Sequence, residues 1–336
     1  MTPTGDRTDL PVLMLYNLDR AWAAHEIEEA IAEANHLQAA LQEVGHPVTP
    51  VIVYDTDLVT PLRPYSRDEY IILNWCEGLP GLPHSYALVA RTLEELNFVY
   101  TGSTPDVLAL SEDKREVKAL LDARSVPTPQ WSIYESAQPN GWGRFPAIVK
   151  PAQEHCSLGI TSEAVVMTPG ELHDRIAYVL DTFQQPALVE DFVDGREFHV
   201  SLWGNGAIQM LPPAEMDFSA FSDVHDRLCT YDSKFNPSSV HYNQIKLQLP
   251  APLTPDEYRR LEQISVAAYR AVGCRDYARL DIRLRDGVFY VLDVNPNADI
   301  SSDASLAYSA DAAGYSYGAL GSHLVNLARH RKLIGV

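Results

Sequence analysis

The feature of this 336-residue chain that most constrains its fold is an alternation of strand and helix patterns over roughly the first 110 residues. Apolar runs typical of buried strands occupy residues 11–17, 48–55 and 70–78, and amphipathic helix patterns occupy residues 23–45 and 86–97. We expect the first helix to end at Gly45, because glycine adopts the positive φ that closes many helices. This alternation predicts an open α/β sheet.

Two further units follow the first. The second contains helix patterns at 113–125 and 170–183 and strand patterns at 145–150 and 187–193. The third contains a strand at 197–204, a segment at 212–246 that we expect to be irregular, and helices at 255–272 and 317–331. We therefore predict three domains: residues 1–110, residues 111–189 and residues 190–336.

The net charge of the chain limits the kinds of partner that it can bind. A net charge of −19 and a pI near 4.9 argue against nucleic acid, whose phosphates require a basic surface. The N-terminal residues are polar, and no apolar run approaches about 18 residues, so we expect a cytoplasmic protein without a membrane span. The four cysteines show no CxxC spacing, which predicts reduced thiols and neither a zinc site nor a disulfide framework.

The stretch "ARLDIRLRDGVFYVLDVNPNADIS", residues 278–301, predicts two strands joined by a tight turn. Strand alternation explains its apolar residues. It does not explain why Asp281, Asp293 and Asn295 should project from one patch of the hairpin with Arg279 beside them. Three oxygen donors and a guanidinium at one place indicate a functional site.

The loop "KPAQEHCSLGI", residues 150–160, follows a predicted strand and contains Lys150, Ser157 and Gly159. Small and polar residues at such a position can turn backbone N–H groups toward phosphates. The loop lacks the Walker A and GxGxxG patterns. Taken alone, it can equally be a surface hairpin loop.

Five motifs in order carry a resemblance to a known family. They are "TGSTPDVLALSEDKREVKALLDARSVPTP", "FPAIVKPAQEHCSLGI", "ALVEDFVDGREFHVSL", "YDSKF" and "ARLDIRL…VLDVNPNADIS". Together they cover most of the chain and resemble the ATP-grasp superfamily, in its D-alanine–D-alanine ligase-like branch. The resemblance implies an α/β protein with α+β subdomains, in which an N-terminal open α/β domain precedes the ATP-grasp fold. It also implies a homodimer.

The resemblance implies that ATP binds to particular residues of this chain. Lys114 and Lys150 are similar to the pair that neutralises the α- and β-phosphates, and Lys234 is similar to a lid lysine that reaches the γ-phosphate. The loop with Ser157 and Gly159 would contact the phosphates. The adenine and ribose contacts that the resemblance implies come from one short segment: Glu190, the backbone of Asp191 and Val193, Phe192 beside the base, and Glu197 on the ribose hydroxyls.

The resemblance also answers the question raised by the hairpin. Asp281, Asp293 and Asn295 are similar to the ligands of two Mg²⁺ ions, with Mn²⁺ as an alternative, because hard cations take oxygen donors. Asp293 would bridge the ions, where the family more often has Glu. Arg279 would stabilise the anionic tetrahedral centre.

The implied reaction is that of a ligase acting on two small molecules, a carboxylate and an amine. The carboxylate attacks the γ-phosphate of ATP to give an acylphosphate, and the amine then displaces phosphate to form an amide. "NWCEG", "HCS" and "NPNADIS" depart from the usual D-alanine–D-alanine ligase motifs, so we expect an amino acid or small carboxylate other than D-alanine. A non-amine acceptor, phosphorylation without ligation, and a non-catalytic nucleotide-binding protein remain open. Substrate contact by Glu77, Cys156, Asn297 or Asp299 is also open.

Overall fold

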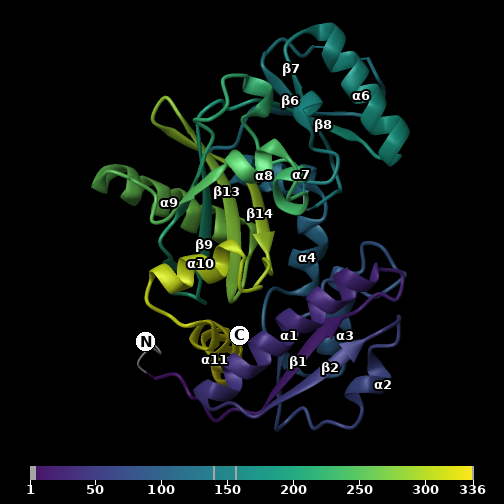
Figure 1. The fold of residues 1–336 in the computed structure, drawn as a ribbon, viewed down its shortest axis with the longest axis vertical. Coiled ribbons are helices and arrows are strands. Elements are labelled where there is room, and N and C mark those ends of the chain that lie inside the picture. The colour runs from purple at the N-terminus through teal and green to yellow at the C-terminus, as the bar shows by residue number, and fades with distance from the viewer. Residues whose placement is uncertain (1–4, 139–140, 156, 335–336) are drawn as a thin grey trace.

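Three β-sheets organise the chain, with the first at the bottom, the third in the middle and the second at the top of Figure 1. The computed structural model describes residues 5–138, 141–155 and 157–334, so Cys156 lies outside the described residues. None of the helices in these ranges is long and apolar enough to cross a membrane. The elements are α-helices, short 3-10 helices and strands, as the mixed α/β prediction required.

The first sheet is parallel, with strand order β2-β1-β3-β4, and it confirms the α/β alternation predicted from the N-terminal sequence. Its strands and the helices between them are β1 (Val12–Asn17), α1 (Ala24–Val44), β2 (Val48–Val53), α2 (Val59–Leu62), β3 (Ile71–Trp75), α3 (Tyr86–Glu95) and β4 (Val99–Tyr100). Helix α1 ends at Gly45, which has a φ of 122°, as predicted.

The C-terminal helix α11 (Tyr317–Ile334) packs against α1 and β3 of this first sheet. A Cβ atom at Gly318 would lie 2.2 Å from the carbonyl oxygen of Ala40, so glycine is required for this close approach. The division of the chain into domains stays a prediction. Residues that we assigned to the third unit nevertheless contribute to the packing of the first sheet.

The second sheet is antiparallel, with strand order β5-β8-β6-β7. Its elements, and the two helices that lead into it, are α4 (Pro105–Ser111), α5 (Lys114–Ala123), β5 (Trp131–Tyr134), β6 (Ala147–Pro151), η1 (Ser162–Ala164), β7 (Val165–Val166), α6 (Pro169–Phe183) and β8 (Ala187–Asp191). Helix α6 begins after Thr168, whose side chain caps it, and packs its apolar face on this sheet.

The third sheet has six strands, in the order β12-β11-β9-β13-β14 with β10 paired to β9. Its elements are β9 (Arg196–Trp203), β10 (Gln209–Met210), β11 (Ala214–Asp217), η2 (Val224–Asp226), α7 (Asp232–Phe235), α8 (Val240–Gln244), β12 (Lys246–Gln248), α9 (Pro255–Val272), β13 (Tyr277–Arg285), β14 (Val288–Pro296) and α10 (Ser305–Ala312). The prediction that residues 212–246 are irregular was wrong. Strand β11 lies there and is held by its partners β9 and β12, which are distant contacts that local periodicity does not reveal.

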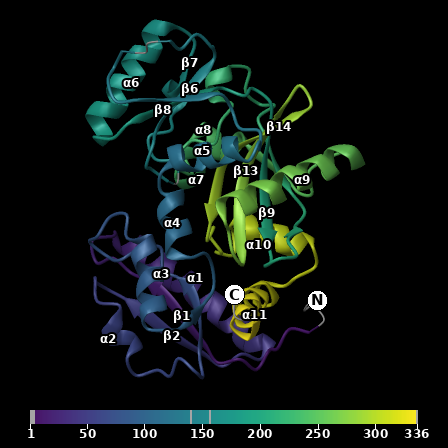
Figure 2. The same cartoon turned by 180° about the vertical axis from the view of Figure 1, so that it is seen from behind.

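Strand alternation divides the third sheet into an apolar face and a polar face. Even-numbered residues of β9 and β13, such as Phe198 and Leu280, belong to a core that they share with α5 and α9, the two helices that lie in front of the sheet in Figure 2. Odd-numbered residues, such as Glu197 and Asp281, therefore project from the opposite face. The polar face is directed toward the second sheet, and residues of both sheets line a pocket between them.

The hairpin predicted over residues 278–301 is confirmed as β13 and β14, joined at Asp286 and Gly287. Its register sets Arg279 opposite Asn295 and Asp281 opposite Asp293. A β-bulge follows, because Ile282 pairs with Val291 and leaves one extra residue in β14. The four polar side chains singled out from the sequence therefore meet in one patch.

Candidate active site

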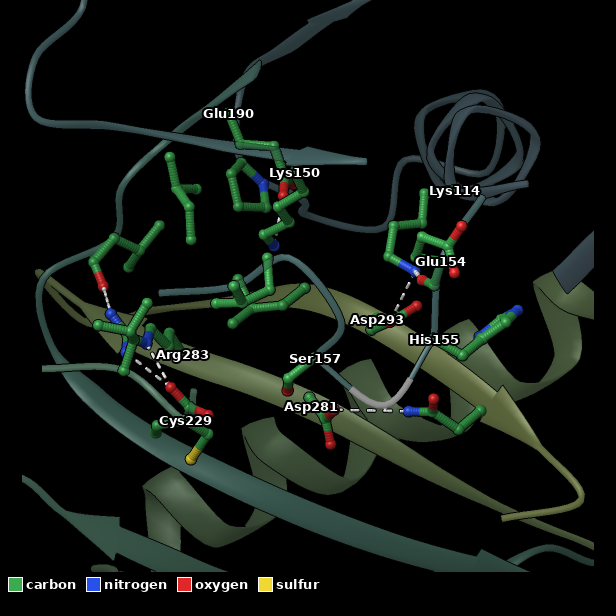
Figure 3. Close-up of a pocket in the computed structure, with 18 of the residues that line it drawn as sticks. Lys114, Lys150, Glu154, His155, Ser157, Glu190, Cys229, Asp281, Arg283 and Asp293 are labelled. Atoms are coloured by element: carbon green, nitrogen blue, oxygen red, sulfur yellow. Dashed lines mark hydrogen bonds and ion pairs between the residues drawn. The ribbon is translucent and has the colours of Figure 1, made fainter. Parts of the chain in front are cut away.

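A pocket lies between the second and third sheets, and most of the predicted site residues line it (Figure 3). Its walls come from β6 and β8 on one side and from β9, β13 and β14 on the other. The predicted residues among those that line it are Lys114, Lys150, Ser157, Glu190, Asp191, Phe192, Val193, Glu197, Lys234, Arg279, Asp281, Asp293 and Asn295. Residues separated by up to 181 positions in the sequence thus converge on one cavity.

Gly159 is the predicted site residue that the structure does not place on the wall of this pocket. It has a φ of +75°, and a Cβ atom there would lie 2.7 Å from the ring of Phe183. Its carbonyl oxygen accepts a hydrogen bond of 2.6 Å from Arg175. Turn geometry and packing against α6 therefore account for this glycine, and its contact with phosphate stays a prediction.

A buried cluster of one carboxylate and two ammonium groups lies at the end of the pocket near β8. The Glu190 carboxylate is 2.6 Å from Lys150 Nζ and pairs more closely still with Lys118 Nζ. Burial would raise the pKa of Glu190, but the two ammonium groups lower it. The side chain of Glu190 therefore positions Lys150. The sequence singled out both residues but did not indicate this contact between them.

Lys118 is a residue that the sequence analysis missed. Its side chain is buried, and its Nζ also donates to Thr128 Oγ1 at 2.7 Å and to the Val291 carbonyl at 3.3 Å. Burial lowers the pKa of Lys118, while Glu190 opposes that shift. The available signal was its spacing, because Lys114 and Lys118 are four residues apart on one helix and so share a face.

Lys114 links the loop at 150–160 to the hairpin. It is the first residue of α5, and the side chain of Asp113 caps this helix. Its Nζ donates to the Glu154 carbonyl at 2.5 Å and lies 3.6 Å from Asp293 Oδ2. Figure 3 shows the lysine reaching from the helix toward Asp293. A phosphate held between this loop and the hairpin would meet the ammonium group.

The hairpin patch holds two carboxylates in a largely enclosed position. Arg279 donates to both oxygens of Asp281, at 2.9 and 3.1 Å. Burial would raise the pKa of Asp281 and that of Asp293, but Arg279 lowers the first and Lys114 lowers the second. Both acids are therefore held as carboxylates.

The donor chemistry of this patch fits Mg²⁺. Two carboxylates with side chains 19% and 23% exposed offer hard oxygen ligands at the pocket wall. The Asn295 amide presents its nitrogen to Asp281 at 3.5 Å, so the amide group must rotate for its oxygen to face a cation. With that rotation, the predicted ligands Asp281, Asp293 and Asn295 form an oxygen-donor set.

Arg283 organises the opposite end of the pocket and was also missed from the sequence. It is buried, donates to Glu197 Oε2 at 2.7 Å and to the Val193 carbonyl at 2.9 Å, and lies over the Phe192 ring. Burial would raise the pKa of Glu197, but Arg283 and His199 lower it well below its ordinary value. The signal in the sequence was the Arg–x–Asp–x–Arg alternation of β13.

The segment between β8 and β9 is fixed by arginines. Arg285 donates to the Asp191 carboxylate at 2.5 Å and to the Phe192 carbonyl at 3.2 Å. With Arg283 on Val193, two guanidinium groups from one strand therefore hold this segment against the pocket. A planar base would meet a backbone edge that is already positioned.

Residues near the first sheet that the sequence left open have different environments. Asn297 is buried and has a φ of 53°; its Oδ1 accepts from the Ser103 N–H at 2.6 Å, and its carbonyl accepts from Tyr86 Oη at 2.9 Å. Its side chain is therefore committed to holding the hairpin end. Glu77 and Asp299 are exposed, and protein around the Glu77 carboxyl, together with Asp299, raises the pKa of Glu77 to about 7.

Comparison with known proteins places this geometry in context. Residues 127–326 match the family model described as "D-ala D-ala ligase C-terminus". The uncharacterized protein y4sG of Sinorhizobium fredii is 34% identical over 310 residues, which is 90% of this chain and 88% of that protein. A D-alanine–D-alanine ligase of Pseudothermotoga lettingae is 26% identical over 299 residues, covering 89% of this chain and 94% of the relative.

Solved structures resemble the whole chain. The crystal structure of D-alanine–D-alanine ligase from Bacillus anthracis complexed with ATP has a TM-score of 0.71 at 22% identity, covering 96% of this chain and 99% of that one. A second structure of the ligase from that organism has a TM-score of 0.73 at 22% identity, covering 97% and 100%. The chain therefore shares its overall fold with these structures.

Proposed function

The chain belongs to the D-alanine–D-alanine ligase family, and we propose that within it this protein joins an amino acid or other small carboxylate to an amine, with a substrate pair other than two D-alanines. As a member of this family it is an ATP-dependent ligase that forms carbon–nitrogen bonds. The ATP-grasp fold expected from the motifs is confirmed by the structural matches. The roles of individual residues, and the identity of the substrates, are the proposal.

The observation that carries the proposal is the convergence of Lys114, Lys150 and the hairpin carboxylates on one pocket. Local cations let a chain of net charge −19 bind a polyanion, because nearby charges outweigh distant ones. We assign the two lysines to the α- and β-phosphates, residues 190–193 to adenine and Glu197 to the ribose. Lys234 lines the pocket from α7 and would reach the γ-phosphate.

Mg²⁺ bound at Asp281, Asp293 and Asn295 would neutralise phosphate charge and orient the transferred group. Two ions are expected, and Mn²⁺ could replace them. The residues of the chain then do the rest. Lys114 and Lys150 hold the phosphates in line, and Arg279 places a fixed cation where negative charge develops.

The reaction proceeds in two displacements. A carboxylate oxygen of the first substrate forms a bond to the γ-phosphorus while the bond to the β,γ-bridging oxygen breaks, which releases ADP and leaves an acylphosphate. The amine of the second substrate then forms the C–N bond, loses a proton and expels phosphate. Exclusion of water by the segment that carries Lys234 would protect the acylphosphate.

The acceptor side supports a substrate other than D-alanine. Glu77 and Asp299 are exposed acidic residues near the first sheet. The Asn297 side chain is buried and accepts a hydrogen bond from the Ser103 N–H. An ammonium group of the substrate would pair with these carboxylates and favour the charged form of Glu77. "NPNADIS" also lacks the glycine that D-alanine–D-alanine ligases resembling this chain carry in the corresponding turn.

An oxygen-transfer experiment tests the proposed chemistry. Pools of L- and D-amino acids and small peptides, with ¹⁸O in their carboxylates, would be incubated with Mg·ATP. The account predicts ADP, phosphate that carries one ¹⁸O, and a product whose mass equals two substrates minus water. Phosphate without ¹⁸O would contradict an acylphosphate. A product that carries an ester, or a stable acylphosphate, would instead show a non-amine acceptor or phosphorylation alone.

A further inference from the structure

Three donors of different chemistry meet on the nucleotide pocket. Within the ranges that the structure describes, Glu197, His199 and Cys229 offer oxygen, nitrogen and sulfur atoms that all lie within 4.8 Å of one another. Glu197 and His199 are alternate residues of β9 and so share a face of the sheet. Cys229 comes from the segment between η2 and α7, and all three residues line the pocket.

The surroundings of His199 allow one ring nitrogen to act as a ligand. Its Nδ1 lies 3.2 Å from Ser305 Oγ, at the start of α10, and this hydroxyl can accept a hydrogen bond from Nδ1–H when a metal takes Nε2. Nε2 then carries the lone pair. It faces Glu197 Oε1 at 3.8 Å and Asp281 Oδ1 at 3.9 Å. Outer partners of this kind orient histidine ligands in metal sites.

Glu197 keeps one oxygen available. Arg283 occupies Oε2 at 2.7 Å, while Oε1 is the oxygen that faces His199. The Arg283 guanidinium opposes a cation and is balanced by the Glu197 carboxylate, while Asp281 is already paired with Arg279. The charge that attracts the cation would therefore come from the Cys229 thiolate that forms on binding. The third ligand, the Cys229 thiol, is a free thiol.

The combination of thiol, imidazole and carboxylate selects a particular class of ion. Zn²⁺ accepts all three, whereas Mg²⁺ prefers oxygen donors such as those of the hairpin. Zinc–ligand distances of about 2.0–2.3 Å put tetrahedral ligands about 3.4–3.8 Å apart, so the three atoms must approach by about 1 Å. The thiol would give its proton to solvent as the metal–sulfur bond forms.

We propose that Glu197, His199 and Cys229 form an inhibitory site for a thiophilic divalent cation, for which Zn²⁺ is the fitting ion. Occupation would tie the segment that carries Cys229 to β9 and would remove Glu197 from the ribose. Zinc and nucleotide would then exclude each other. The exclusion rests on the proposed function, because it requires Glu197 to bind ribose, whereas the metal site itself does not.

Co²⁺ is the probe for the site, because its bond to a thiolate absorbs in the near ultraviolet. Reduced full-length protein without nucleotide would be titrated with Co²⁺ and then with Zn²⁺. We expect one thiolate–Co²⁺ band that Zn²⁺ removes. Cys229→Ser, a change that preserves shape, should abolish the band, while Cys274→Ser, outside the pocket, should keep it. Absence of the band in the unaltered protein, or its survival in Cys229→Ser, would overturn the proposal.

Glu197→Gln and His199→Gln test the remaining ligands. Each should weaken Co²⁺ binding by at least roughly tenfold, because loss of a ligand should cost no less than the loss of an outer partner. Far-ultraviolet circular dichroism would verify that both variants remain folded. Affinity unchanged in both variants would show that Cys229 binds cobalt with other partners, and would overturn this ligand set.

Competition with adenosine tests inhibition, because adenosine carries the ribose but has no phosphates to chelate zinc. Saturating Zn²⁺ should weaken adenosine binding at least about tenfold in the unaltered protein and leave it unchanged in Cys229→Ser. A cobalt band without this competition would overturn the inhibitory role. Normal ¹⁸O transfer without a cobalt band would overturn the metal site alone, so the two proposals fail separately.

Discussion

Around the pocket, where we propose that nucleotide binds, charged side chains are buried in pairs. Glu77 and Asp299, on the proposed acceptor side near the first sheet, are by contrast exposed residues that do not line this pocket. Glu190 holds the buried Lys118 and the partly buried Lys150, and buried Arg283 holds buried Glu197. In the part of the chain that the structure describes, burial and the Asp299 carboxylate raise the pKa of Glu77, and no ammonium or guanidinium group opposes them. The two sides therefore differ in whether the protein supplies the opposite charge.

The difference indicates where a ligand is expected to bring charge of its own. Buried pairs are costly to form and fix geometry before binding, which suits a nucleotide that does not vary. The acidic residues on the acceptor side have no basic partner among the described residues, so the ammonium group of a substrate could pair with them. If this interpretation holds, changes on the nucleotide side should cost rate and stability, while changes on the acceptor side should alter pH dependence and selectivity.

Asp293→Ala should produce the largest effect. Removing this carboxylate, which we propose binds metal and which lies beside Lys114, should lower kcat/KM for ATP turnover by on the order of 10³-fold or more. Steady-state ADP release measures it. The matched control is Asp286→Asn in the turn of the same hairpin, because asparagine tolerates the φ of 52° found there. Equal loss in both variants would mean that the hairpin, and not the carboxylate, was damaged.

Lys118→Met should be next. It leaves Glu190 with Lys150 as its single lysine partner and should lower the free energy of unfolding by about 3 kcal/mol, as breaking a buried ion pair does. Urea denaturation measures the change. Lys246→Met on exposed β12 should stay within about 0.5 kcal/mol of the unaltered protein. If Lys118→Met left the free energy of unfolding unchanged, the buried ion pairs would not distinguish the nucleotide side from the acceptor side.

Glu197 should make the stability of the folded protein depend on pH in the acidic range. Burial would raise its pKa, but Arg283 and His199 lower it below its unfolded value of about 4.3, so its stabilisation is present above that pH and lost below it. The difference in Tm between the unaltered protein and Glu197→Gln should therefore shrink between pH 5 and pH 3. A difference that is constant over this range would show that the carboxylate does not titrate as described.

Glu77→Gln should have the smallest effect on stability. The pKa of Glu77 is raised to about 7, so the folded protein binds this proton more tightly than the unfolded chain, and stability falls as pH rises from about 4.3 to 7. The variant should therefore gain stability relative to the unaltered protein between pH 5 and pH 8. Because the side chain is exposed, we expect less than about 1 kcal/mol. Thermal unfolding at both pH values measures it, and a gain that does not grow with pH would contradict the raised pKa.

Sequence patterns predicted the N-terminal α/β alternation and the hairpin because both depend on local periodicity, whereas the ATP-grasp fold was implied by the resemblance of five motifs. The alternation around Asp281 and Asp293 predicted their strands, and the register then brought them together. Lys118 and Arg283 were missed because a buried charge is explained only by its distant partner: Glu190 lies 72 positions from Lys118, and Glu197 lies 86 positions from Arg283. Cys229 gave no signal, because its fellow donors lie on another segment.

Residues 212–246 show the same limit. Strand β11 is short, and its partners stabilise it more than its own sequence does. The packing of α11 on α1 likewise joins the two ends of the chain, so no local pattern predicts it. Local chemistry was readable; long-range pairing was not.

We propose that a nucleotide site of the type found in D-alanine–D-alanine ligases serves an acceptor other than D-alanine. The most direct test compares ADP release and product mass with D-alanine alone and with mixed amino acid and peptide pools, at one Mg·ATP concentration. The account predicts an amide product from a pool, and kcat/KM for D-alanine alone at least about tenfold lower, which corresponds to about 1.4 kcal/mol. The proposal would be contradicted if the enzyme turned over D-alanine alone as efficiently as any other substrate pair and formed D-alanyl-D-alanine.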